Sequence, residues 1–131
     1  MREHLRLGFL VPDGALDARA VHRYRVATDP WAIASVIVSL ADRWSTRGTR
    51  ARQRWIRRHE QLAIEMMQAL ALPVAAPLLR GDTLAEALGC EPGPVIGALL
   101  AQIAEEQAAG TISNEAEAIS FARTQPSAPT A

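Results

Sequence analysis

Hydrophobic residues recur along most of the chain with the spacing of one face of a helix. This pattern predicts an all-α fold, a bundle of about six helices without a sheet. The β-branched run 33–38 also fits a strand, but the length of its segment and the continuing helical period favour a helix. The expected helices span residues 17–28, 31–44, 49–72, 82–88, 94–109 and 114–123.

Residues with special backbone preferences predict where these helices begin and end. Asp17 is placed to cap the first helix. Asp29 and Pro30 predict the start of the second, because aspartate accepts free N–H groups and proline lacks the N–H that a first turn leaves unpaired. Asn114 followed by Glu117 is a capping-box pattern. Glycines are expected to end three helices: Gly48, Gly89 and Gly110.

Three of the helices carry apolar faces that predict the core. The second helix is apolar nearly all round, which is typical of a helix at the centre of a bundle. Its main face holds Ile33, Ile37, Leu40, Ala41 and Trp44. The later half of the long helix is expected to pack through Leu62, Ala63, Met66, Met67 and Leu70. The helix before Gly110 presents Val95, Ile96, Leu99, Leu100 and Ile103.

The composition is that of an ordinary soluble globular protein. The 131 residues are 49% hydrophobic and 21% charged, enough for one compact unit or two small ones. No apolar run reaches the length of a membrane span, and no apolar signal core follows the N-terminal residues. We therefore expect a cytoplasmic protein without a membrane partner. The single cysteine excludes an internal disulfide.

A net charge of zero conceals a strong asymmetry. Residues 1–60 hold twelve of the fourteen basic residues, all arginines, and six of the fourteen acidic ones. Seven arginines fall in the span 43–58 with no acid between them, and Trp55 lies among them. Guanidinium groups bind phosphates in a bidentate manner, so several in a row can follow a nucleic-acid backbone. The candidate RNA-binding residues are Arg43, Arg47, Arg50, Arg54, Arg57 and Arg58.

A solvated face, balanced by the acidic second half of the chain, explains the same arginines equally well. Arg50, Arg54, Arg57 and Arg58 share one face of the expected helix. For Trp55, packing is the favoured role over stacking on a base.

The second half carries a pattern of turn residues at fixed spacing. Its members are Gly81, Asp82, Gly89, Pro92, Gly93, Pro94 and Gly97. Pro92-Gly93-Pro94 predicts a turn at a helix entrance, and Gly97 predicts close approach of another backbone. The N-terminus of that helix offers free N–H groups to an anion. A packing corner between helices is the alternative interpretation of each residue taken alone.

This pattern resembles the C-terminal helical region of bacterial tRNA nucleotidyltransferases and poly(A) polymerases. In that family the same turn residues precede a Gln, a Gly-x-Ile and a capped Glu-Ala helix, as Gln107, Gly110, Ile112 and 114–118 do here. The first half resembles the end of an HD domain, a helical metal-dependent phosphohydrolase fold. His4 and Asp42 would then match two of its metal ligands.

The resemblance implies three segments: residues 1–72 as the C-terminal part of an HD-like domain, 73–123 as a helical tail domain and 124–131 as a disordered tail. The family's catalytic head, with two carboxylates that hold Mg²⁺, has no counterpart in the sequence, and the His-Asp pair of an HD site is also missing. We therefore expect no catalytic residues, no cofactor and no metal beyond the weak candidates His4 and Asp42.

Three functions remain open at this stage. The first is a non-catalytic module that binds tRNA or another structured RNA for a head supplied elsewhere, such as a separately encoded catalytic half. The second is a protein-interaction or homodimerising module, with Trp31, Val36, Ile37 and Trp44 as the place to look for an exposed apolar face. The third is a degenerate phosphohydrolase that depends on Asp42. The parent reaction, whether CCA, single-A or poly(A) addition, is left open.

Overall fold

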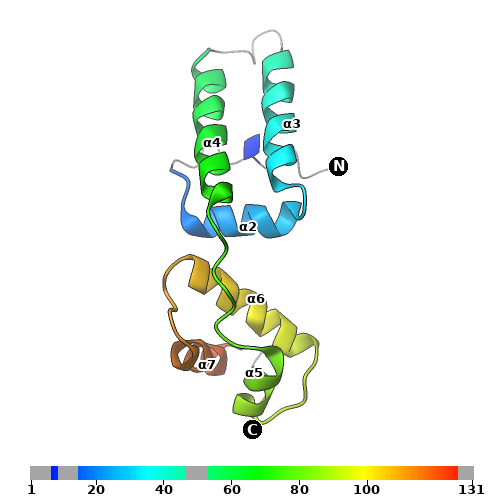
Figure 1. Cartoon of the computed structure of the whole chain (residues 1–131), viewed down its shortest axis with the longest axis vertical. Coiled ribbons are helices and arrows are strands. Elements are labelled where there is room, and N and C mark those ends of the chain that lie inside the picture. The colour runs from blue at the N-terminus through cyan, green and yellow to red at the C-terminus, as the bar shows by residue number, and fades with distance from the viewer. Residues whose placement is uncertain (1–6, 9–14, 47–52, 127–131) are drawn as a thin grey trace. The chain divides into compact units, whose positions relative to one another are not determined.

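The structure is a computed structural model, and it describes residues 7–8, 15–46 and 53–126. Six helices have bounds within these residues, and no strand occurs among them, so the all-α prediction is confirmed. In chain order the helices are α2 (Ala18–Thr28), α3 (Ala32–Ser45), α4 (Gln53–Ala71), α5 (Gly81–Leu88), α6 (Pro94–Ala108) and α7 (Glu115–Thr124), shown in Figure 1. The predicted start of the long helix, the stop at Gly48, and residues 127–131 of the tail lie outside the described residues.

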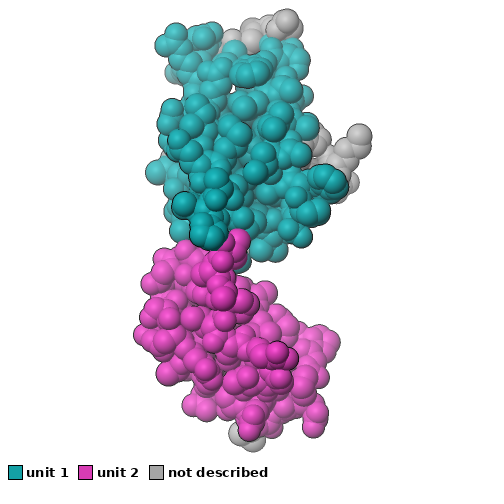
Figure 2. Space-filling model, viewed as in Figure 1, with its two compact units in different colours: residues 1–73 teal, residues 74–131 magenta. Residues whose placement is uncertain are grey.

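The chain divides into two compact units, Met1–Pro73 and Val74–Ala131 (Figure 2). The sequence placed its boundary between residues 72 and 73. The assignment of the first unit to an HD-like domain stays a prediction.

Unit 1 is a hairpin of α3 and α4 with α2 lying across one end of it (Figure 1). Its buried core consists of Leu7, Tyr24, Val36, Leu62, Ala63, Met66 and Leu70. Arg25 of α2 fastens the end of α4, because one of its Nη atoms donates to the main-chain oxygens of Ala69, Leu70 and Leu72 at 3.2–3.3 Å. These oxygens lie at the C-terminal end of α4 and just after it, where a helix leaves carbonyl groups without internal partners and a positive charge is favourable.

The start of α3 differs from the prediction. The chain makes a turn at residues 29–30, and Asp29 caps the C-terminus of α2 instead of the N-terminus of α3. The N–H of Trp31 donates to the Thr28 oxygen at 2.6 Å, so Trp31 becomes the N-cap and the helix begins at Ala32. Pro30 therefore belongs to the turn, where its fixed φ is equally acceptable.

The position of α3 in the bundle also differs from the prediction. Val36 and Ser39 face the core, whereas Ile33, Ile37 and Trp44 of the predicted face are 51–57% exposed. The helix is apolar on both sides but is covered on only one, because α2 and α4 pack against the side that carries Val36.

Unit 2 joins α5, α6 and α7 around its own core. The buried residues are Leu79, Leu84, Ala85, Ile96, Leu99, Ile103, Ile112, Ala118 and Ala122. Of the predicted stripe on α6, Ile96, Leu99 and Ile103 are buried, whereas Val95 is 45% exposed. The segment before α5 is held to this unit because the amide of Gln107 donates to the Ala76 oxygen at 2.8 Å.

The local signals of unit 2 are confirmed. Gly89 ends α5 with a φ of 67°, and the N–H of Cys90 reaches the Ala85 oxygen at 3.0 Å, a Schellman motif. The Asn114 side chain caps α7 by accepting from the Glu117 N–H at 3.0 Å. The Glu117 carboxylate accepts from the N–H of Ser113, one residue before the donor expected of a capping box.

Candidate nucleic-acid interface

The candidate arginines of unit 1 gather at one end of the α3–α4 hairpin. Since α3 and α4 are successive and antiparallel, the last turn of α3 and the first turns of α4 meet at the end opposite α2 (Figure 1). Arg43 comes from α3, and Arg54, Arg57 and Arg58 come from α4. Arg47 and Arg50 lie outside the described residues. We call the four described arginines the basic end of unit 1.

The four arginines differ in exposure. Arg54 and Arg57 are exposed, whereas Arg43 and Arg58 are half-buried. Three positions apart on one helix, Arg54 and Arg57 lie on neighbouring turns of the same side of α4. They are the two described arginines of the basic end best placed to contact a large anionic ligand.

Trp55 supports one of these two arginines. The guanidinium carbon of Arg54 lies over its indole ring, 5.0 Å from the ring centre. Such a cation–π contact uses the flat face of the guanidinium and leaves its N–H edges available for phosphate oxygens. Trp55 is 38% exposed, so it lies at the surface, and Arg54 covers part of its ring.

Two side-chain bonds hold α3 and α4 together next to the basic end. The Trp44 indole N–H donates to a Glu60 carboxylate oxygen at 2.7 Å. The Ser39 hydroxyl and Nε2 of His59 lie 3.0 Å apart, and both residues are buried. These bonds fix the register between the helices and therefore the spacing of arginines on both.

This environment disfavours the protonated form of His59. Burial lowers the pKa of its imidazole, and the positive charge of Arg43 lowers it further, whereas Ser39, Asp42 and Glu60 act in the opposite direction. Nδ1 of the ring has no hydrogen-bond partner. Sequence reasoning missed this pair because its partners are twenty positions apart.

Other arginines serve the fold itself. Arg25 caps α4 as described above, and Arg123 of α7 donates to the Ala87 oxygen at the end of α5 at 3.1 Å. Among the described arginines of the first half, Arg25 thus stabilises the fold, whereas Arg54 and Arg57 are exposed at the basic end.

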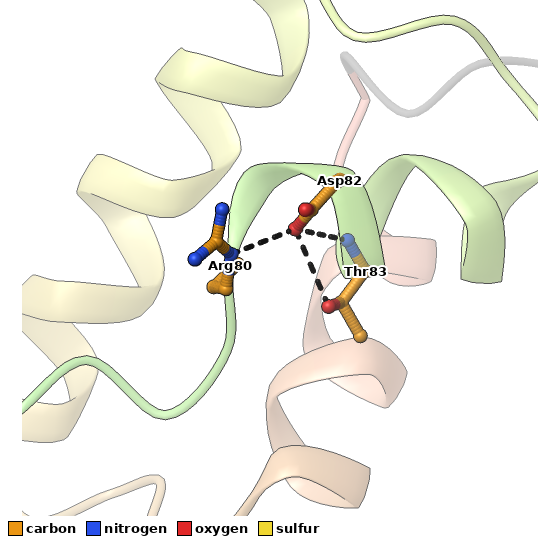
Figure 3. A network of polar contacts seen from close by, with 3 residues as sticks. All are labelled: Arg80, Asp82 and Thr83. Atoms are coloured by element: carbon orange, nitrogen blue, oxygen red, sulfur yellow. Dashed lines mark hydrogen bonds and ion pairs between the residues drawn. The ribbon is translucent and has the colours of Figure 1, made fainter.

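The turn residues of unit 2 build its corner. At the start of α5 a carboxylate oxygen of Asp82 accepts from the Thr83 N–H at 2.9 Å and pairs with Nε of Arg80 at 3.3 Å (Figure 3). The Thr83 N–H, followed by Arg80, lowers the pKa of the Asp82 carboxyl. A Cβ at Gly81 would lie 3.4 Å from Cδ1 of Leu100, an ordinary contact distance, so α5 packs closely on α6 at this position.

The Pro92-Gly93-Pro94 turn opens α6 as predicted. Gly93 is its N-cap in extended conformation, and Pro94 occupies the first turn. The role predicted for Gly97 is wrong for the described part of the chain, because a Cβ built there meets nothing within 4 Å. Whether the N-terminus of α6 holds an anion stays a prediction.

The metal candidates gain no support. Asp42 is exposed near the end of α3, and His4 lies outside the described residues. Within the ranges that the structure describes, no three His, Cys, Asp or Glu side chains are grouped so as to hold a metal ion. This part of the chain therefore offers nothing to the phosphohydrolase alternative. Nor is any helix among the described residues long and apolar enough to cross a membrane.

Comparison with known proteins adds one match. The family model described as tRNA nucleotidyltransferase domain 2 matches residues 16–122, which include most of both units. The chain matches no curated protein and no solved structure.

Proposed function

Because the chain belongs to the tRNA nucleotidyltransferase domain 2 family, we propose that it is a non-catalytic module that binds folded RNA, with tRNA as its ligand. Its role is to hold the RNA so that the 3′ end reaches a nucleotidyltransferase head outside this sequence. The finer features predicted from the sequence, namely the HD-like origin of unit 1 and the kinship with poly(A) polymerases, belong to the same proposal.

The observation that carries the proposal is the basic end of unit 1. Arg54 and Arg57 are exposed on neighbouring turns, and the ring of Trp55 holds the guanidinium of Arg54 in place. Fixing an arginine before it binds reduces the side-chain entropy that is lost in the complex. Two exposed guanidinium groups on neighbouring turns, one of them held in place, suit the phosphates of an RNA backbone better than they suit a small ligand.

Recognition of this kind depends on shape. Arginines on one helix contact phosphates and carry no information about base identity, so the spacing of phosphates in a folded RNA decides which RNA is preferred. The family's head would supply the Mg²⁺-dependent chemistry. The described residues of this chain offer no ligand set for that ion, and they contribute binding and orientation.

The proposal is tested by titrating the chain into labelled tRNA and into unstructured RNA of equal length over a salt series. We expect tighter binding to tRNA and a steep loss of affinity with salt, because each neutralised phosphate releases bound counterions. Arg54→Ala combined with Arg57→Ala should weaken binding about tenfold or more and reduce the slope of log affinity against log salt by roughly two.

A matched control removes the same charge elsewhere. Arg23→Ala combined with Arg80→Ala deletes one exposed arginine from α2 and one from the start of α5, neither of which belongs to the basic end. Its affinity should stay within about twofold of the unchanged chain if Arg54 and Arg57 act specifically and not through net charge. Equal loss in both double variants, or equal affinity for tRNA and unstructured RNA, would contradict the proposal.

A further inference from the structure

Unit 1 leaves a large apolar surface open on α3. The side chains concerned are Trp31, Ile33, Ile37, Val38 and Trp44, which are 51–70% exposed. We call them the outer face of α3. Between Ala32 and Ala41 the helix carries no charged residue on any side. A helix that is apolar all round is normally covered all round.

The size of the outer face matches what an interface needs. An aromatic side chain buries roughly 150–250 Å², so the two tryptophans alone expose on the order of 250 Å², and the aliphatic side chains bring the face to about 500 Å². That is near the upper end of the roughly 300–600 Å² of the largest patch on a monomer. A stable interface buries about 800 Å² per partner, of which ~56–65% is apolar, so the outer face is large enough to form its core.

Two pairs of like residues lie symmetrically about the middle of α3, whereas other positions, such as Ala32 and Arg43, do not match. Trp31 and Trp44 form one pair and Ala34 and Ala41 another, and both pairs are centred between Ile37 and Val38. If two α3 helices pack antiparallel about a two-fold axis at that centre, each Trp31 lies at the end where the other copy has Trp44. Each exposed Ala34 then lies opposite the other copy's exposed Ala41, and small side chains there let the helices approach closely. A two-fold interface requires this reciprocity.

Trp44 is fixed before any partner arrives. Its indole N–H is bound by Glu60 at 2.7 Å while 57% of the residue stays exposed. Buried aromatic anchors contribute much of the energy of an interface, and an anchor that is already ordered loses little entropy on binding.

From the size, reciprocity and order of this face, we propose that two copies of the chain associate through the outer face of α3, with the two α3 helices antiparallel. The proposal is independent of RNA binding, because the outer face carries no arginine.

Sedimentation velocity of the full chain across a wide concentration series tests the association. The unchanged chain should form a dimer, and Ile37→Glu should weaken it at least tenfold, since a carboxylate at the two-fold axis would be buried against its own copy. Val95→Glu makes a comparable change at an exposed position of unit 2 and should leave the dimer unchanged. Both positions are on the surface, so circular dichroism should show folded chains in each case.

Cross-linking tests the geometry. Chains with Cys90→Ser that carry either Ala34→Cys or Ala41→Cys are given different tags, mixed and oxidised. The antiparallel arrangement predicts a disulfide between the two kinds of chain and little between chains of the same kind.

A chain that is monomeric at every concentration, a dimer that persists in Ile37→Glu, or cross-links between like chains only would each overturn the proposal. A monomer that forms a one-to-one complex with a separately expressed nucleotidyltransferase head would assign the face to that head instead, and would equally overturn association of two copies.

Discussion

The two units of this chain use apolar residues in different ways. In unit 2 three helices share one core, and α6 buries Ile96, Leu99 and Ile103 of its predicted stripe. Among the helical residues of this unit in the described ranges, only Val95 is a large apolar side chain left exposed. In unit 1 α3 carries two apolar faces, and the hairpin covers only one of them. An apolar pattern therefore identifies which positions avoid water, but the number of helices available decides which of them are covered within the chain.

The largest expected effect is a difference in stability loss when alanine replaces a buried apolar residue of unit 2 and when it replaces an exposed one of unit 1. Leu99 is fully buried, so Leu99→Ala should lower the free energy of unfolding by about 2–5 kcal/mol. Ile37 is 55% exposed, and Ile37→Ala should change the free energy of unfolding by only about 0.5 kcal/mol in a monomer. Urea denaturation followed by circular dichroism measures both. At concentrations where the chain dimerises, the loss for Ile37→Ala should grow, and a loss as large as that of Leu99→Ala in dilute solution would contradict the exposed position of Ile37.

An intermediate effect compares two glycines within unit 2. Gly89 has a φ of 67°, where a Cβ is strained, so Gly89→Ala should destabilise the unit by about 1 kcal/mol. Gly97 lies inside α6 with nothing near its Cβ position, so Gly97→Ala should stabilise it by about 0.5–1 kcal/mol. The midpoint of thermal unfolding should move in opposite directions for the two variants. If Gly97→Ala weakens tRNA binding while it raises stability, the open space beside Gly97 receives the ligand.

The smallest expected effect near neutral pH is a difference between the two units in how their stability changes as the pH falls. Burial lowers the pKa of His59 below the value of about 6.5 in the unfolded chain, so the unfolded chain takes up the proton first as the pH falls. Unit 1 should therefore be fully stabilised above about pH 6.5 and lose stability below it. In unit 2 hydrogen bonds from Ser113 lower the pKa of Glu117, and those stabilising contributions disappear only at the more acidic pH where carboxylates are protonated.

Unfolding measured from pH 7 to pH 4, with a fluorescence signal from the tryptophans of unit 1, follows the first process. All three tryptophans and all three histidines belong to that unit. His59→Gln should flatten the dependence between pH 6.5 and 5. A slope unchanged in that variant would mean that another group of unit 1 is responsible.

Local signals explain how much the sequence could predict. Asp17, Gly89 and Asn114 act on the backbone within four residues of themselves, and the structure confirms all three. The prediction for Asp29 is wrong because this residue lies in a short loop between two helices, next to the end of one and the start of the other. The turn at Pro30 makes Asp29 the C-cap of α2 instead of the N-cap of α3. The buried side of α3 depends on where α2 and α4 pack, and no local pattern encodes that choice.

In the candidate site, too, local features could be predicted from the sequence, whereas features that depend on contacts between distant residues could not. The sequence shows the arginine cluster as a run of positive charge. The predicted helix boundaries place these arginines at the end of one helix and the start of the next. Which arginines are exposed was not predictable, because the contacts that recruit Arg25 and Arg123 to carbonyl groups span more than thirty residues. The pairing of Arg54 with Trp55, although local, depends on side-chain conformations that a sequence pattern does not specify.

The hydrogen bonds made by Arg25 and Gln107 determine the length of the linker between the two units. Arg25 secures the Leu72 oxygen to unit 1, and Gln107 secures the Ala76 oxygen to unit 2. Only residues 73–75 lie between these anchor points, and the first of them is a proline with a restricted φ. Three residues span at most roughly 10 Å when extended, so the tether is short and partly stiff. The short linker would therefore keep unit 2 at a high effective concentration near an RNA bound to unit 1. This effective concentration does not depend on the affinity of unit 2 alone for RNA.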